Sequence, residues 1–231
     1  MRKKAEYRGV VTAKGSTRLT HDSQETALSD LRGARLYSIG PLVATLDEFV
    51  GEAELHGLMM GLSSIRQAAA QVTGVMGQGV DPRRVADSAK IPHGSLPVLD
   101  AVATRIAKIF GLPVSHCESP ELISYGVGGL FKRHFDAALG GAMYKAPADA
   151  AEHSQRVLTA ILYLNDEFAG GETVFPRLDL TLRPKAGRLA LWQNTKAGDV
   201  AVHPLSMHEG RPVQSGQKQI VSFWFRNKPV Q

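Results

Sequence analysis

The spacing of apolar residues predicts two amphipathic helices in the first half of the chain. The first is indicated by apolar side chains that recur every three or four positions, namely Leu55, Leu58, Met59, Leu62 and Ile65. The second shows the same spacing in Leu99, Val102, Ile106 and Ile109. Its start is indicated by Ser95 as a cap and Pro97 in the first turn, and its end by Gly111. The segment 74–94 between them is rich in turn-forming residues and is expected to be a loop.

From about residue 119 the pattern changes to the two-residue period of β-strands. Leu178, Leu180 and Leu182 alternate with polar residues, and residues 188–193 alternate again after a turn signal at 184–187. Near the end, the apolar residues at positions 221, 223 and 225 share one face of a strand. Residues 42–46 form an earlier strand. Short strands with Gly and Pro between them, and no helices, favour an antiparallel jelly roll or barrel. The fold class is therefore α+β, with supporting helices before a β core.

The pattern also divides the chain into three regions. Residues 1–39 form a mostly polar arm without a regular period, residues 40–118 form a helical support region, and residues 119–231 form the β core. The chain has 231 residues, of which 43% are hydrophobic, and this suits a single globular domain with an appendage. The last two regions are therefore expected to share one domain.

Composition excludes several classes of site. Cys117 is the only cysteine, so the chain has no internal disulfide framework and no multi-cysteine zinc or iron–sulfur site. No apolar run approaches the roughly 20 residues needed to span a bilayer. The basic N-terminus is not followed by the apolar stretch of a secretory signal. We therefore expect no membrane partner and a cytoplasmic location.

The net charge of +5 and the pI near 9.4 raise the question of a nucleic-acid partner. The basic residues are scattered, and only Arg2-Lys3-Lys4 forms a run. The sequence also lacks the alternation of aromatic and basic residues on which single strands stack. A nucleic-acid partner is therefore not expected, and the excess charge is better explained by solubility or by anionic small molecules.

Candidate chemistry begins with His134 and Asp136. On a strand, residues two positions apart point to the same side, so this pair can converge on one metal ion. Such a pair also arises by chance, as in His116-Cys-Glu118. His208, in a later strand-like segment, would complete a set of two histidines and one carboxylate. This set leaves open coordination positions and is the facial triad of non-haem Fe(II) oxygenases. Taken alone, His208 is better explained as a histidine bonded within the core or at a strand end.

Lys218 lies ten residues beyond His208, at the start of the last predicted strand. An ammonium group that points into a β core is costly unless it meets an anion. The distal carboxylate of a dicarboxylic acid would satisfy it. The alternative is a solvated lysine after the turn at residues 215–217.

Together, His134, Asp136, His208, Lys218 and Tyr125 resemble the prolyl 4-hydroxylase branch of the Fe(II)/2-oxoglutarate dioxygenases. Two segments between them are similar to motifs of this family: Arg156-Val-Leu-Thr159-Ala-Ile-Leu-Tyr163-Leu-Asn165 and Gly170-Gly-Glu-Thr-Val-Phe-Pro176. Residues 184–187 and 212–213 also match in order and spacing. The resemblance extends weakly upstream to Arg84 and covers about residues 40–228.

The resemblance implies a double-stranded β-helix (jelly-roll) core and a set of cofactors. Fe(II) would be bound by His134, Asp136 and His208. The C5 carboxylate of 2-oxoglutarate, the co-substrate, would be bound by Lys218. O₂ would be consumed, succinate and CO₂ released, and an unactivated C–H bond hydroxylated. Ascorbate is a candidate reductant.

The family also implies roles for residues around the metal. Tyr125 and Thr159 would help to hold 2-oxoglutarate, and Arg156 and Trp224 would line the substrate side. For each of them, an ordinary packing or hydrogen-bonding role in the core is the alternative. The segment 170–176 is expected to be a structural turn whose glycines allow positive φ.

The chain departs from the family near the substrate groove. Phe131 stands where the family usually has a tyrosine, and Gln219 stands where a tryptophan is common. The substrate is therefore left open between a prolyl residue of a peptide or protein and a free amino acid or related metabolite. The segment 137–153, rich in Ala and Gly, is a candidate lid over the pocket.

Two alternatives remain at this point. A zinc hydrolase could use the same three ligands with a metal-bound water, and it would give Lys218 no role. A non-catalytic β-barrel binding module would bind no transition metal. A homodimer is a candidate assembly under any of these hypotheses.

Overall fold

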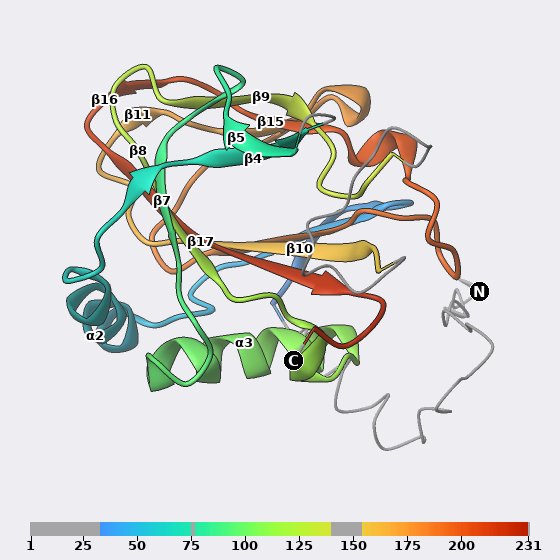
Figure 1. Cartoon of the computed structure of the whole chain (residues 1–231), viewed down its shortest axis with the longest axis horizontal. Coiled ribbons are helices and arrows are strands. Elements are labelled where there is room, and N and C mark those ends of the chain that lie inside the picture. The colour runs from blue at the N-terminus through green and yellow to red at the C-terminus, as the bar shows by residue number, and fades with distance from the viewer. Residues whose placement is uncertain (1–32, 75–76, 140–153, 231) are drawn as a thin grey trace, which may run out of the picture.

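The structure is a computed structural model and describes residues 33–74, 77–139 and 154–230. Two antiparallel sheets face each other, and two helices cover the outer face of the larger sheet. Figure 1 shows strands β10 and β17 of the larger sheet between helix α3 on one side and strands β9 and β15 of the smaller sheet on the other. The α+β class is thus confirmed.

The larger sheet has eight strands in the order β1-β2-β14-β10-β17-β8-β7-β3. Their bounds are β1 Arg35–Ile39, β2 Leu42–Leu46, β3 Ala68–Ala69, β7 Asp87–Lys90, β8 Glu121–Tyr125, β10 Arg156–Tyr163, β14 Leu189–Gln193 and β17 Lys218–Arg226.

The smaller sheet has five strands in the order β13-β12-β15-β9-β6. Their bounds are β6 Arg84–Val85, β9 Leu130–His134, β12 Thr173–Phe175, β13 Leu180–Leu182 and β15 His208–Gly210. Two further strand pairs are β4 Gln71–Gly74 with β5 Gly77–Val80, and β11 Ala169–Gly170 with β16 Val213–Ser215. Short 3-10 helices occur at Val114–His116, Pro176–Leu178 and Pro204–Ser206.

Both predicted helices are present, as α2 Glu52–Leu62 and α3 Pro97–Phe110. Helix α3 ends at Gly111, whose φ of 63° is left-handed, as a glycine cap allows. Its N-cap is Leu96, so the prediction of Ser95 as the cap was wrong. The hydroxyl of Ser95 instead donates to the carbonyl of Pro92. Among the helices that the structure describes, none is long and apolar enough to cross a membrane.

The alternation along β10 and β17 creates two different environments. One face of β17 carries Val221, Phe223 and Phe225, which pack with α2 and α3 in one apolar core. The opposite face points toward the smaller sheet and carries Lys218, Ile220, Ser222 and Trp224. Because β10 lies beside β17 in the sheet, Thr159 faces the same interior as these residues. The space between the two sheets is therefore where polar side chains from several strands meet.

The prediction of a loop over residues 74–94 was wrong. Within this segment β5 pairs with β4, and β6 is the edge strand of the smaller sheet. Strand β7 joins the larger sheet, where it pairs with β8. These strands are short and their residues are polar or small, so they carry no two-residue apolar period. The predicted arm lies mostly outside the described residues, although its last residues form β1. The three-region division stays a prediction, and residues 40–118 contain strands as well as helices.

Candidate metal centre

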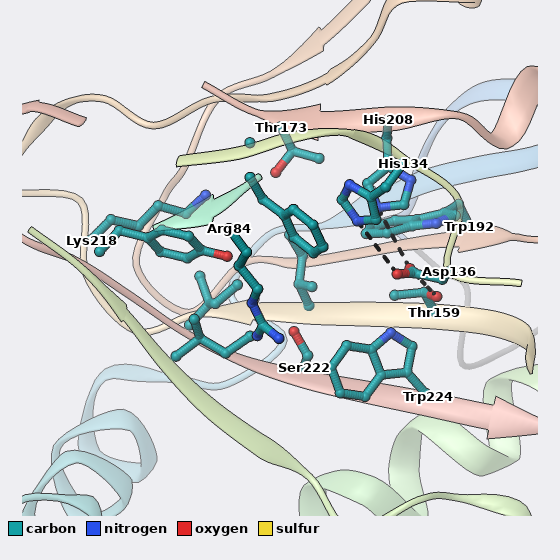
Figure 2. A pocket seen from close by; sticks show the side chains of 16 residues that line it. Arg84, His134, Asp136, Thr159, Thr173, Trp192, His208, Lys218, Ser222 and Trp224 are labelled. Atoms are coloured by element: carbon teal, nitrogen blue, oxygen red, sulfur yellow. Dashed lines mark hydrogen bonds and ion pairs between the residues drawn. The ribbon is translucent and has the colours of Figure 1, made fainter. Parts of the chain in front are cut away.

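His134, Asp136 and His208 converge at one end of the space between the sheets. His134 is the last residue of β9 and His208 is the first of β15, and the two are register partners across adjacent strands. Asp136 follows β9 in a bend. One ligand atom from each residue lies within 4.8 Å of the others (Figure 2). The sheet therefore brings together the three residues that the sequence singled out.

Hydrogen bonds to the backbone show which nitrogen of each histidine ring carries no proton and can bind a metal ion. The Nδ1 of His134 lies 2.7 Å from the carbonyl oxygen of Lys132, and the Nδ1 of His208 lies 2.9 Å from that of Ser206. A carbonyl can only accept, so each Nδ1 carries the proton. Each Nε2 lies 3.6 Å from an oxygen of Asp136, one on Oδ1 and one on Oδ2. The lone pairs of both rings therefore face the carboxylate.

The charge state of the site also suits a divalent metal ion. Burial lowers the pKa of His208 to about 4, with the neighbouring His134 adding to the effect, so its ring is neutral at physiological pH. Burial would raise the pKa of Asp136, but His208 and His134 outweigh it, and the pKa stays well below its ordinary value. An ionised carboxylate and the neutral ring of His208 are donors of the kind that metal binding requires.

Aromatic rings hold the two histidines in place. The ring of Phe131 stacks on that of His134, with centroids 3.5 Å apart and planes 13° apart. The indole of Trp192 meets the ring of His208 edge-on, at 4.7 Å and 62°. On its outer side, Phe131 has the guanidinium of Arg84 5.3 Å from its centroid. The ring planes are thus set by packing before any metal binds.

Lys218 is at the other end of the same space, as its side chain in Figure 2 shows. It is the first residue of β17 and only 3% exposed, and its Nζ donates to the carbonyl oxygen of Gly171 at 2.7 Å. The rings of Tyr125 and Tyr163 lie 5.2 and 5.5 Å from Nζ. Burial lowers the pKa of Lys218 to about 8, with Glu172 opposing the shift. Within the described part of the chain, no carboxylate forms a salt bridge with this ammonium.

A cavity joins the two ends. Its wall contains Ile123, Ile161 and Ile220, together with the hydroxyl-bearing Thr173 and Ser222. Water is disfavoured along the isoleucines, and a ligand with two polar ends and an apolar middle would match both ends. The arrangement can hold a metal ion and an anionic group at opposite ends of one small molecule.

Among the other predicted site residues, Tyr125, Thr159, Phe131 and Trp224 line this cavity. The hydroxyl of Thr159 lies 2.7 Å from Oδ2 of Asp136. Whether Thr159 also contacts 2-oxoglutarate stays a prediction.

Arg156 is one layer behind the cavity wall. Its Nε and one terminal nitrogen each lie 2.7 Å from an oxygen of Glu118, and its guanidinium carbon is 4.1 Å from the centroid of Trp224. Arg226 donates to the same carboxylate at 2.7 Å. The structure therefore joins Arg156 to the substrate side through Trp224.

Sequence reasoning missed part of the lining. Thr173 lies in the segment expected to be only a turn, yet its hydroxyl is 2.8 Å from that of Tyr163 and it faces the cavity. The left-handed φ values of Gly170 and Gly171, 75° and 69°, confirm the turn itself. Arg84 is buried and forms a 3.3 Å ion pair with Glu121. Arg84 follows Arg83 in a polar segment, so no signal in the sequence indicated that its side chain would be buried.

Two other predictions concern the substrate side. Gln219 points away from the cavity, and its side chain donates to the hydroxyl of Ser124. The candidate lid, residues 137–153, lies mostly outside the described residues.

Comparisons with known proteins agree with this geometry. Residues 120–226 match the model of the 2OG-Fe(II) oxygenase superfamily. A candidate prolyl 4-hydroxylase of Acanthamoeba polyphaga mimivirus is 31% identical over 133 residues, which are 57% of this chain and 54% of that protein. Prolyl 4-hydroxylase subunit alpha-1 of Gallus gallus is 32% identical over 151 residues, 63% of this chain and 28% of that subunit. The chain thus spans about half or less of the length of these relatives.

Similarity to a solved structure covers more of the chain. The viral collagen prolyl hydroxylase of Paramecium Bursaria Chlorella virus-1, in its 2OG complex, aligns with a TM-score of 0.63. The alignment covers 80% of this chain and 95% of that one, at 21% identity. This likeness confirms the predicted double-stranded β-helix fold.

Proposed function

We propose that the chain is an Fe(II)- and 2-oxoglutarate-dependent hydroxylase of the prolyl 4-hydroxylase type, with residues 120–226, which match the model of the 2OG-Fe(II) oxygenase superfamily, as its catalytic domain. The observation that carries the proposal is the placement of a His/Asp/His triad and a buried lysine at opposite ends of one cavity. A zinc hydrolase would need only the triad, and it leaves the position of Lys218 without a purpose.

In this proposal the chain's own residues divide the work. His134, Asp136 and His208 hold the metal. Lys218 binds the distal carboxylate of 2-oxoglutarate, while Thr173 and Tyr125 lie at the same end of the cavity. Bound Fe(II) would supply the reaction with O₂ that no side chain can perform, in which 2-oxoglutarate yields succinate and CO₂ and a C–H bond is hydroxylated. The isoleucine wall keeps water away from the co-substrate.

We further propose a prolyl residue of a peptide or protein as the substrate. The relatives that match are named prolyl 4-hydroxylases, and the structural neighbour is named a collagen prolyl hydroxylase. Trp224, backed by Arg156, and Phe131 form the side of the cavity nearest the triad where this residue would lie. Because Phe131 lacks a hydroxyl, a free amino acid or related metabolite is the rival substrate.

The test combines binding with a product screen. Anaerobic addition of Fe(II) and 2-oxoglutarate should give a visible absorption band, and succinate release should then be measured with proline-containing peptides and with free amino acids. His134→Ala should abolish both, whereas His56→Ala, which changes an exposed histidine on α2, should change neither. Full turnover without 2-oxoglutarate or without Fe(II) would overturn the proposal. Preference for free amino acids would overturn the peptide substrate alone.

A further inference from the structure

A buried hydrogen-bond relay connects the metal ligands to a residue behind the cavity wall. Thr159, in the middle of β10, is 1% exposed. Its Oγ1 lies 2.7 Å from Oδ2 of Asp136 and 2.7 Å from Nδ2 of Asn194. An ionised carboxylate can only accept a hydrogen bond, so the hydroxyl proton of Thr159 is directed at Asp136. The oxygen of Thr159 must then accept from the amide of Asn194, and the direction of the whole relay is determined.

Asn194 is also connected to the second histidine. It follows β14 directly and is 0% exposed. Its backbone carbonyl accepts from the N–H of His203 at 2.9 Å and lies 3.2 Å from the hydroxyl of Ser206, which has a shorter bond of 2.8 Å to the carbonyl of His203. The carbonyl of Ser206 accepts the Nδ1 proton of His208. One residue therefore contacts the supports of two ligands, through its side chain on the Asp136 side and through its backbone on the His208 side.

The side-chain carbonyl of Asn194 provides an independent indication. Its Oδ1 is buried and has no hydrogen-bond partner among the described residues. An unsatisfied buried acceptor costs roughly 1–3 kcal/mol. An apolar side chain of similar size would avoid that cost, so the amide is not explained by stability. What it provides is the N–H that orients Thr159.

From these contacts we infer that Asn194 is a positioning residue for the metal centre, acting through Thr159 on Asp136. The inference rests on the proposed function, since it requires that the triad binds a metal ion. Without the Asn194 donor, the hydroxyl of Thr159 can rotate toward other acceptors, and Oδ2 of Asp136 loses its fixed partner. The carboxylate then samples orientations in which its oxygens do not face the Nε2 atoms of the histidines.

The test measures metal affinity directly, with Co(II) as the probe and its visible absorption as the readout. Asn194→Leu keeps the approximate size and removes the donor without adding a charge, and Thr159→Val keeps the shape and removes the hydroxyl. Each should weaken Co(II) binding by about 10- to 100-fold, the usual effect of losing an outer partner of a metal ligand. Thr159→Ser restores the hydroxyl and should rescue most of the affinity. Thr45→Val, a buried threonine on β2 away from the triad, is the matched control and should bind like the wild type.

A double variant separates positioning from a general loss of structure. If Asn194 acts through Thr159, then Thr159→Val with Asn194→Leu should bind Co(II) no more weakly than Thr159→Val alone. Additive losses would overturn the relay. Wild-type affinity in both single variants, with circular dichroism unchanged, would overturn the inference and leave the proposed function in place. Failure of the wild type to bind Co(II) would overturn the metal centre itself, and the inference with it.

Discussion

The ammonium group of Lys218 lies 2.7 Å from the carbonyl oxygen of Gly171, in a chamber closed by the rings of Tyr125 and Tyr163. A single neutral acceptor does not neutralise a buried cation. Among the described residues, no carboxylate forms a salt bridge with Lys218, so an anionic ligand could neutralise its ammonium group. This relationship allows the co-substrate end of the cavity to be tested separately from the metal end.

Lys218→Met should weaken 2-oxoglutarate binding and leave metal binding unchanged. A hydrogen bond to a charged group contributes roughly 1.5–3 kcal/mol, so the loss should be about 10- to 100-fold in affinity. Calorimetry with Mn(II) in place of iron would measure both constants. Lys185→Met is the matched control, because Lys185 is a half-exposed lysine paired with Asp47. Equal affinity in Lys218→Met and the wild type would contradict the proposed role.

The affinity for 2-oxoglutarate should also depend on pH. The pKa of Lys218 is lowered to about 8 by burial, so the free protein loses this positive charge as the pH rises above 8. Binding a dianion restores the proton, and the dissociation constant should then increase by about tenfold for each further pH unit. Titrations between pH 7 and 9.5 would show this, and Lys218→Met should show no such trend. A flat profile in the wild type would indicate that another group binds the carboxylate.

The lowered pKa of Lys218 also predicts how the free energy of unfolding depends on pH. A lysine whose pKa is lower in the folded state than in the unfolded state penalises folding while it is charged. The penalty is complete below pH 8 and disappears as the pH rises toward the ordinary value of 10.5. The free energy of unfolding of the ligand-free wild type should therefore rise over this range relative to Lys218→Met. Urea denaturation at several pH values would measure the difference, and a constant difference would contradict the assignment.

Glu118→Gln should destabilise the fold substantially. The carboxylate of Glu118 holds the guanidinium groups of Arg156 and Arg226 at 2.7 Å, and all three side chains are largely buried. Removing the shared charge leaves two cations uncompensated, at a cost of about 3 kcal/mol. Glu54→Gln breaks a more exposed pair with Arg105 and should cost less than about 1 kcal/mol. Similar midpoints of urea denaturation for the two variants would contradict this ranking.

The contribution of Glu118 to the free energy of unfolding should decrease in acid. Burial would raise its pKa, but Arg156 and Arg226 outweigh burial and lower the pKa below 4.5. Its stabilising contribution is then fully present above that value and is lost as the pH falls through the folded-state pKa. The stability difference between wild type and Glu118→Gln should therefore narrow in acid. If the difference in the free energy of unfolding between the wild type and Glu118→Gln stays constant below pH 4, this assignment of the ionised Glu118 is contradicted.

Gly170→Ala should be more harmful than Gly198→Ala, although both glycines have positive φ, 75° and 73°. At Gly198 an added Cβ meets nothing within 4 Å, so only the left-handed conformation is strained, by about 1–2 kcal/mol. At Gly170 the Cβ would overlap the carbonyl oxygen of Pro212, which adds roughly 1–3 kcal/mol of overpacking. Urea denaturation would rank the two variants. Equal losses of stability in the two variants would show that the turn at Gly170 can shift away from Pro212 and relieve the overlap.

Sequence reasoning succeeded where local pattern and local chemistry agree. Helix α3 combines a helical apolar period, an early Pro97 and a Gly111 cap, and all three features are local. His134 and Asp136 could be paired because they are two residues apart on a predicted strand, whereas His208 and Lys218 were assigned only when combined with the family resemblance.

What could not be predicted depends on contacts between distant segments. Arg84 reaches the cavity wall only because β6 pairs with the β9 segment at Phe131. Asn194 contacts Thr159 because β14 lies beside β10. Neither residue belongs to a sequence period, since β6 has only two residues and Asn194 follows the end of β14. Such residues become visible only when the sheet order is known.

The register pairing of His208 with His134 has a consequence for folding. A shift of β15 against β9 by one residue would turn the ring of His208 to the opposite face of the sheet. A metal ion held by both rings binds the correct alignment and not the shifted one, and its binding free energy is added to that alignment alone. The supply of that metal ion would then influence how faithfully this pair of strands aligns.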